Sequence, residues 1–529
     1  MTDAANSGIY VLEGMSRGQR IGVRRETVVV FLGSTPRGPV SIPVTIRSVN
    51  EYLARFGSPD YADRLRVLLT QFFGNGGTKA IVVRVSQSSR YSRLSLAGPS
   101  GPLILEAINP GPWESLRASI DYDHISDADA DHFNLVIHRM TSPTVHIVEE
   151  QEIFTAISVK PEDSDYLGHA LMNSVLVRPC GTPPAARPAN TLHLGVEAAA
   201  SYVYAGTEWA PDEALTDYDM VGSDSEGTGL FALDLLPIVD LVCMVPDADR
   251  DIGPVALFMA ERYCRKRNAF LLMDPPSQWN SVEAVQKNCR EQEFCSPNVM
   301  TYFPRLENKG QQGDVSCTSV LGAIAGRLAA EDAVDGISAP DRQDSVVLRC
   351  RPGLELSLSD SDCVMLARNG INALRRVRPG HIQMSGLVTF ARGIELAADW
   401  NDLRKRRSVL FIVESIARGT RWAAFDENAE ETWAEIRQQV ENFLQALYEQ
   451  GALSGVTPKA SFYVFCDSET NRLSRSIAGS GQKIESKSFT FCVGFTLQGA
   501  GDLAFRFVHN VFECRVDELG WQPGIALAS

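Results

Sequence analysis

Three short segments of the 529-residue chain carry residue types that enzymes use. Gly74 to Lys79 reads GNGGTK, and glycines followed by a lysine are typical of loops that cradle phosphates. Gly227 to Ala232 reads GTGLFA and matches a relaxed dinucleotide-binding fingerprint. Met273 to Pro276 places an aspartate at the end of an apolar run, where a hydrolase could use it in a catalytic triad.

None of these segments has the context that its chemistry requires. The lysine of Gly74 to Lys79 has the wrong spacing for a P-loop, and the segment precedes an apolar strand pattern, so it is predicted to end a helix. No strand leads into Gly227, and no acidic residue is suitably placed after it. The nucleophile-elbow motif G-x-S-x-G does not occur, and Asp274 has no evident histidine partner.

Three histidines fall within one stretch of short strand patterns, which raises the question of a metal site. They occupy opposite or distant strand positions, so their spacing favours surface histidines over zinc ligands: His132, His138 and His146. We therefore expect no catalytic residue, no cofactor and no metal, and the sequence predicts that the protein is not an enzyme.

Composition sets the outer limits of the function. With 44% apolar residues the chain can bury a large core, and at this length it is expected to divide into about three or four domains. Its formal charge of −15 would repel a phosphate backbone, so nucleic acid is not expected as a partner. The apolar runs are far shorter than the ~20 residues of a membrane helix, so no membrane insertion is expected.

Signals for export are not found in the sequence. The first residues lack a basic start followed by an apolar run, so no secretory signal peptide is expected. The eleven cysteines form no C-x-x-C pair and often lie in apolar runs, which predicts reduced, buried thiols in a cytosolic protein.

The N-terminal quarter predicts strands and a helix in β-α-β order. Ile9 to Leu12 is a short β-type run without an adjacent hairpin partner, and Thr27 to Gly33 is an apolar run typical of a strand covered on both faces. Val49 to Phe73 has apolar residues at largely helical spacing, and Ala80 to Val85 is a second buried strand.

The middle of the chain changes pattern twice. From Leu94 to Pro179, short strands broken by Gly, Pro and Asp predict an inserted antiparallel β-sandwich. A Pro-rich connector and a polar, acidic stretch follow it. From Phe231 the α/β alternation returns, with a strand before Asp247, a helix over Val255 to Asn268 and a strand over Ala269 to Pro276. This order implies parallel pairing.

The block from Arg404 to Asn471 is the most distinctive part of the sequence. A basic and apolar segment leads through Gly419 to a Trp-containing turn, an amphipathic helix over Glu430 to Tyr448, a Gly turn and a strand. The predicted buried stripe of that helix consists of Trp433, Ile436, Val440, Phe443, Leu444 and Leu447. This order closely resembles the C-terminal domain of contractile tail sheath proteins, which polymerise around the tail tube of contractile phages and related injection devices.

The resemblance extends over both ends and the centre of the chain. Six blocks match sheath motifs in order: Gly8 to Glu13, Phe31 to Pro59, Gln71 to Val85, Ala269 to Pro276 (ending in D-P-P), Val320 to Asp341 (the G-x-x-A-G helix) and Ala367 to Gly380 (the G-I-N turn). Two stretches depart from the family pattern, Ser316 to Gly322 before the G-x-x-A-G helix and Ile382 to Ala391 after the G-I-N turn. These departures put local packing in doubt rather than the fold.

The resemblance implies a multidomain α/β protein. Its core would be subtilisin-like without a catalytic triad, with a β-sandwich insertion on the outer surface and a C-terminal α/β domain that faces the tube. The expected divisions are an N-terminal exchange arm (1–24), a first α/β segment (25–93), the insertion (94–180), a linker (181–229), the central domain (230–345), the C-terminal domain (346–500) and a C-terminal exchange arm (501–529).

The family's mode of assembly implies roles for both ends of the chain. Terminal strands of neighbouring subunits complete a sheet in a third subunit, because an unpaired strand satisfies its backbone groups by joining a sheet edge. The expected exchange residues are Ile9, Tyr10, Val11, Leu12, Phe505, Phe507 and Val508. Gly14, Gly18 and Gly22 are candidate hinges, since glycine tolerates large backbone changes; a disordered tail is the alternative.

The expected partners are other copies in a helical homopolymer, a tail tube protein, and baseplate and tail terminator proteins. The expected location is a virion tail or an extracellular contractile particle assembled in a host cytoplasm. The only dense basic run, Arg404, Lys405, Arg406 and Arg407, is the candidate tube contact, and a solvated helix end is its alternative. Two rival functions stay open: a hydrolase-like enzyme, and a static virion or baseplate component that shares the α/β core. The sequence does not distinguish a phage tail from a tailocin or an injection system.

Overall fold

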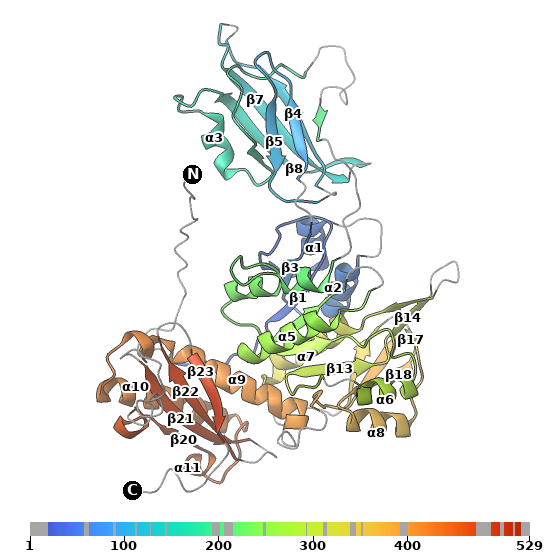
Figure 1. Ribbon diagram of the computed structural model, residues 1–529, viewed down its shortest axis with the longest axis vertical. Helices are drawn as coiled ribbons and strands as arrows, with labels where there is room; N and C mark the ends of the chain where they lie inside the picture. Colours follow the sequence, from blue (N-terminus) through green and yellow to red (C-terminus); the bar gives the residue numbers. More distant parts are fainter. Residues whose placement is uncertain are drawn as a thin grey trace.

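A computed structural model of the chain is shown in Figure 1, with the β-rich insertion at the top, the central sheet in the middle and the C-terminal domain at the lower left. The structure describes residues 20–57, 63–87, 91–111, 114–126, 128–142, 145–192, 202–205, 215–246, 250–291, 294–309, 315–338, 345–350, 353–391, 400–471, 488–497, 502–510 and 514–519.

A nine-stranded mixed sheet forms the centre of the molecule, in the order β16-β19-β18-β13-β12-β11-β1-β3-β2. The run from β18 to β3 is parallel throughout, while β2 and the β16/β19 pair join antiparallel at the two edges. The strands are β1 (Val29–Gly33), β2 (Val44–Ile46), β3 (Ala80–Arg84), β11 (Leu241–Met244), β12 (Phe270–Met273), β13 (Val299–Phe303), β16 (Ser345–Arg349), β18 (Asn372–Arg378) and β19 (His381–Ser385).

Both faces of this sheet are covered, which explains why its strands are continuous apolar runs. In β1, Val29 and Phe31 point into one core while Val30 and Leu32 point into the other. The first face carries α1 (Val49–Phe56), α2 (Arg64–Gly74) and α7 (Leu321–Asp335), and the second carries α4 (Asp217–Val221), η3 (Gly229–Leu235), α5 (Pro254–Lys266), α6 (Val282–Glu291) and α8 (Asp360–Arg368). A small sheet, β15-β14-β17, lies at the margin: β14 (Leu306–Lys309), β15 (Val315–Thr318) and β17 (Gly353–Leu354).

Two glycines bring α7 against α2 at backbone distance. A Cβ atom at Gly322 would lie 2.0 Å from the Leu68 carbonyl oxygen, and one at Gly326 would lie 2.2 Å from that of Phe72. No side chain fits there, so the G-x-x-x-G spacing is a packing requirement of this helix pair.

The insertion is a two-sheet antiparallel sandwich with its own hydrophobic core. One sheet, β4-β5-β9, faces the other, β10-β6-β7-β8, as the sequence predicted. The elements are β4 (Arg93–Leu96), β5 (Leu103–Ala107), β6 (Leu116–Asp121), β7 (His132–Ser142), β8 (Val145–Ser158), α3 (Leu167–Ala170), η1 (Leu171–Asn173), β9 (Val177–Pro179) and β10 (Val203–Tyr204).

The C-terminal domain packs helices on a four-stranded antiparallel sheet, β20-β21-β22-β23. The predicted stripe of its amphipathic helix is buried, with Trp433 half-buried at its edge. The elements are α9 (Leu403–Gly419), η5 (Arg421–Phe425), α10 (Glu430–Glu449), α11 (Pro458–Ser461), β20 (Phe462–Phe465), β21 (Phe489–Thr496), β22 (Asp502–His509) and β23 (Cys514–Leu519).

The structure differs from the sequence expectations in two places. The single helix expected over Val49 to Phe73 is divided, because α1 ends at Gly57, whose φ of 73° is left-handed, and α2 begins with Asp63 as its N-cap. The expected division between the central and C-terminal domains at 345/346 is also displaced. The strands β16, β18 and β19 belong to the central sheet, so the C-terminal domain begins near α9.

No helix within the described ranges is both long enough and apolar enough to cross a membrane.

Candidate functional site

The N-terminal residues singled out from the sequence lie mostly outside the described part of the chain. Ile9 to Leu12, Gly14 and Gly18 are not among the described residues. Gly22 is described and exposed, and a Cβ atom added there would meet no atom within 4 Å. Its neighbour Ile21 is buried in the C-terminal core, where it lies against Gly419 of α9. The chain therefore enters the described structure through the C-terminal domain.

The candidate exchange residues near the C-terminus lie in β22, a central strand of the C-terminal sheet. β22 pairs with β21 on one side and β23 on the other, both from the same chain. Phe505 stacks on Phe495, and Phe507 stacks on Phe491 with ring centroids 4.9 Å apart, so both side chains are part of the core. Val508 is half-buried. Among the described strands, β20 and β23 are the outer strands of this sheet.

The basic run expected to contact a tube is divided by the structure. It forms the first turn of α9, and only Arg404 and Lys405 are partly accessible. Arg406 is buried over the ring of Trp400 and donates to Asn298 Oδ1 from Nη2 at 2.7 Å, and burial lowers its pKa to about 10. Arg407 is buried as well. These two side chains point inward because α9 is covered on nearly every side, so half of the expected contact is not at the surface.

Arg407 belongs to a charged network at the junction of the central sheet and the C-terminal domain. Its Nη2 lies 2.5 Å from Oδ2 of Asp332 in α7, and the Asp332 side chain is completely buried. The same carboxylate accepts a hydrogen bond from the hydroxyl of Thr27, just before β1. Burial lowers the pKa of Arg407, but the Asp332 carboxylate more than offsets this, and the pKa is raised overall.

A second ion pair lies in the same junction. Arg24 donates to Asp240 through both terminal nitrogens, at 2.5 and 2.7 Å, and lies over the ring of Phe411 in α9. Asp240 also accepts from the backbone N–H of Val28, at 2.6 Å. The segment that leads into β1 is thus held by carboxylates of the central domain on one side and by α9 on the other.

Glu414 of α9 adds a titratable group to this junction. Desolvation and, to a smaller extent, the Asp240 carboxylate raise its pKa to about 7, although Arg267 and Arg418 act to lower it. A carboxyl group at this position is therefore partly protonated near neutral pH.

The neck between the central sheet and the insertion is also built on buried arginines. Arg37 is 1% exposed and pairs with Glu149 of β8, whose side chain is 31% exposed. Arg84, at the end of β3, donates to the carbonyl oxygens of Gly38 and Pro110 at 2.6 and 2.7 Å. The loop before β6 is fixed to the core by the second of these bonds.

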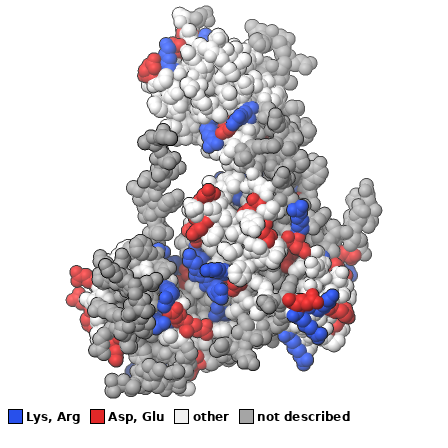
Figure 2. Space-filling view, viewed as in Figure 1, with Lys and Arg blue, Asp and Glu red and all other residues white. Residues whose placement is uncertain are grey.

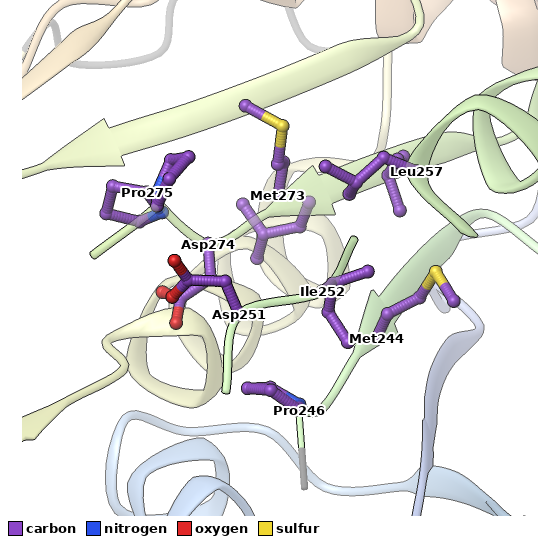
Figure 3. A pocket seen from close by; sticks show the side chains of 11 residues that line it. Met244, Pro246, Asp251, Ile252, Leu257, Met273, Asp274 and Pro275 are labelled. Carbon is purple, nitrogen blue, oxygen red and sulfur yellow. The ribbon is translucent and has the colours of Figure 1, made fainter. Parts of the chain in front are cut away.

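A candidate chemical site lies at the carboxyl ends of β11 and β12, where open α/β sheets commonly bind ligands. Figure 3 shows Asp251 and Asp274 beside a cavity of about 20 Å³, room for a single water molecule. Desolvation raises the pKa of Asp274 to about 6. Its Oδ1 accepts from the Ser319 hydroxyl at 2.9 Å, and Ser319 Oγ accepts from Leu321 N–H at the start of α7. Ser319 therefore connects Asp274 to the first backbone N–H group of α7.

The histidines offer Asp274 no partner among the residues that the structure describes. Those with described side chains lie in the insertion, in β19 and in β22. His138 accepts a hydrogen bond at Nδ1 from Arg117 Nε, at 3.1 Å. His132 pairs with the carboxylate of Asp129. Across the described ranges, no three His, Cys, Asp or Glu side chains gather as metal ligands would.

Sequence reasoning missed the junction network. The local sequence gives no indication of the roles of three of its residues: Arg24, Asp240 and Glu414. Asp332 is the exception, because it is a carboxylate on a helix whose packed face is otherwise mostly apolar. A buried carboxylate on such a helix demands a cation, but the sequence does not say which one.

Comparison with known proteins decides what the fold is. No protein-family model matches the chain, and no curated protein matches it. Among solved structures, the sheath tail protein of Listeria innocua superposes with a TM-score of 0.61 at 12% identity, covering 95% of this chain and 97% of that one. The chain has a contractile-sheath fold.

The sheath fold extends over the whole length of the compared proteins. A sheath tail protein of Desulfitobacterium hafniense gives a TM-score of 0.52 at 10% identity, covering 97% and 99% of the two chains. The helical sheath of the anti-feeding prophage, determined in its contracted state, gives 0.51 at 14% identity and covers 94% and 96%. Because core, insertion and C-terminal domain are all matched, the likeness is to the complete sheath architecture rather than to a widespread α/β core.

Proposed function

We propose that this chain is the structural subunit of a contractile sheath. The observation that carries the proposal is the full-length match to sheath structures, one of them a contracted helical assembly. The Asp274 region also supports the proposal, because Ser319 is bonded both to Asp274 and to the first backbone N–H group of α7. In this proposal the subunits polymerise helically around a tail tube in an extended, metastable state and contract to drive the tube through an envelope.

The subunits of this polymer are joined by exchanged terminal strands. Support comes from the position of the two described ends: Ile21 is buried in the C-terminal core, and β23 forms an edge of the sheet in the same domain. A strand over Ile9 to Leu12 would therefore leave the subunit beside a sheet whose outer strands, among those described, are β20 and β23, and a neighbouring subunit offers the same two strands to it. Exchange through Phe505, Phe507 and Val508 would require β22 to leave its own sheet, so the N-terminal strand is the favoured donor.

The hinge and the tube contact follow from the same arrangement. Packing gives no reason for glycine at position 22, and a flexible link there, with Gly14 and Gly18, suits an arm that must reorient during contraction. The tube contact is carried by Arg404 and Lys405, the accessible part of the basic run. The remaining proposed partners are the tail tube protein and the baseplate and tail terminator proteins, within a virion tail or extracellular particle.

The strand-exchange step is tested by replacing Ile9 and Val11 with proline. Proline removes the backbone donors that a joined strand needs, without shortening the chain. We expect the variant to fold with unchanged thermal unfolding but to form no tubes in negative-stain micrographs, while the conservative control Ile9→Val with Val11→Ile assembles normally. Tubes of normal length from the proline variant would overturn strand exchange through this segment.

A further inference from the structure

The exposed face of α5 combines an aromatic side chain with a row of cations. Phe258 is 53% exposed and Val255 is 43% exposed, near the start of the helix. Arg262 and Lys266 follow Phe258 at intervals of four residues, so all three lie along one face. Arg265 is exposed beside them. Figure 2 shows Lys and Arg gathered at the centre of this view, over the C-terminal end of α5.

This face has no partner within the described structure. The only ion pair of the three cations is that of Arg265 with Glu261, at 3.8 Å, among the residues described. Basic residues in a last turn stabilise a helix through its dipole, but that effect explains neither Arg262 one turn earlier nor an exposed Phe258. An exposed aromatic group beside unpaired arginine and lysine side chains is typical of a protein-binding surface, and on a chain of net charge −15 it favours an acidic one.

The C-terminal domain carries a complementary surface at the beginning of α10. Phe425, at the end of η5, is 66% exposed. Glu427, Glu430 and Glu431 are exposed next to it, and of these Glu430 pairs with Arg437. Arg421, at the start of η5, is also exposed, but the net charge of this surface is still negative. The surface thus repeats the composition of the α5 face, an aromatic group beside charges, with the opposite sign.

The two surfaces lie on different parts of the molecule and do not cover each other within one chain. α5 packs on the central sheet, whereas α10 lies at the outer margin of the C-terminal domain (Figure 1), where Figure 2 shows acidic side chains at the edge. A helical polymer that does not close requires two unlike, complementary surfaces on each subunit. The α5 face and the α10 start meet this requirement.

We propose that the α5 face of one subunit, with Phe258, Arg262 and Lys266, docks on the α10 start of a second copy, with Phe425, Glu427 and Glu431. The contact rests on the proposed sheath function and adds to it a second, side-chain interface besides strand exchange. The aromatic groups provide the buried centre and the charges fix the register and exclude like-charged approaches.

The contact is located directly by photo-cross-linking. The full-length chain carries p-benzoyl-phenylalanine at position 258, or at Val364 of α8 as a control with the same exposed fraction of 53%. In wild-type-like assemblies, irradiation should join position 258 to a peptide that contains residues 425–431 of another copy, identified by mass spectrometry. Cross-links from position 258 to any other surface, of this chain or of another protein, would overturn the assignment.

Charge-reversal variants test the same contact through its effect on assembly. Arg262→Glu with Lys266→Glu, and separately Glu427→Lys with Glu431→Lys, should raise the concentration needed for assembly by about tenfold or more, since each replaces attraction by repulsion. All four changes in one chain should restore assembly, which also shows that the reversed side chains permit folding. Unchanged assembly of both double variants, or no recovery in the quadruple variant, would overturn the contact.

The two proposals fail in distinguishable ways. If wild-type protein forms tubes and the reversed variants form the same tubes at the same concentration, the α5 contact is wrong and the sheath function stands. If wild-type protein forms no helical polymer at any concentration, both proposals fail together.

Discussion

The central domain is joined to its two neighbours through buried arginines, but the two joints are built differently. At the C-terminal junction, Arg407 meets the fully buried carboxylate of Asp332. At the neck of the insertion, Arg84 meets backbone carbonyl oxygens, and Arg37 meets Glu149, which retains contact with water. When two opposite charges are buried together, removing one leaves the other without a partner and strongly destabilises the fold. A hydrogen bond to a carbonyl or to a partly hydrated carboxylate contributes less, so its loss is less costly. We therefore expect the junction to be the more rigid joint.

Asp332→Ala should have the largest effect, because it leaves Arg407 charged and buried without its partner. Loss of one member of a buried pair costs about 3–5 kcal/mol of unfolding free energy. Urea unfolding monitored by circular dichroism measures it. Asp335→Ala, an exposed position on the same helix, is the matched control and should change stability by less than about 0.5 kcal/mol. Equal stabilities of the two variants would remove the contrast between the joints.

Glu414→Gln should have a smaller effect that depends on pH. The carboxyl pKa is raised from 4.5 to about 7 in the folded chain, so the folded state binds the proton more tightly than the unfolded state. The contribution of Glu414 to the unfolding free energy of the wild type should therefore fall as the pH rises from about 4.5 to 7. Above pH 7 this contribution should stay constant. The variant lacks this slope, so its advantage should grow to about 1–3 kcal/mol between pH 5 and pH 8.

Unfolding free energies of wild type and Glu414→Gln at pH 5, 6, 7 and 8 check this directly. A difference between the two proteins that stays constant over this range would show that Glu414 does not titrate within it.

Glu149→Ala should have the smallest effect, because the carboxylate is partly hydrated and Arg37 keeps its bond to the Ala54 carbonyl oxygen, at 3.3 Å. We expect a loss of at most about 1 kcal/mol in the same urea measurement. A loss as large as that of Asp332→Ala would mean that the neck depends on its ion pair as strongly as the junction does.

The sequence predicted features that depend on local patterns, but it did not predict the long-range contacts that build these two joints. Apolar runs such as Val29 to Gly33 and the stripe of α10 depend on local periodicity, and both were predicted from it. The sandwich was likewise visible as short strands with regular breaks. The inward direction of Arg406 and Arg407 was not predictable, because their partners Asn298 and Asp332 are 108 and 75 residues away in sequence.

The position of β16, β18 and β19 in the central sheet could not be predicted for the same reason. Strand patterns indicate that a strand exists, but its neighbour in a sheet is set by long-range packing. The candidate assembly residues Ile9 to Leu12 remain a prediction, since they lie outside the described residues.

Electron cryo-microscopy of the purified full-length chain tests the sheath function most directly. We expect hollow helical tubes whose subunits are joined head to tail, with the C-terminal domain on the inner side and the insertion on the outer side. Closed rings or shells would support a static virion or baseplate component instead. A protein that stays monomeric at every concentration, or one that forms only closed assemblies, would contradict the sheath assignment.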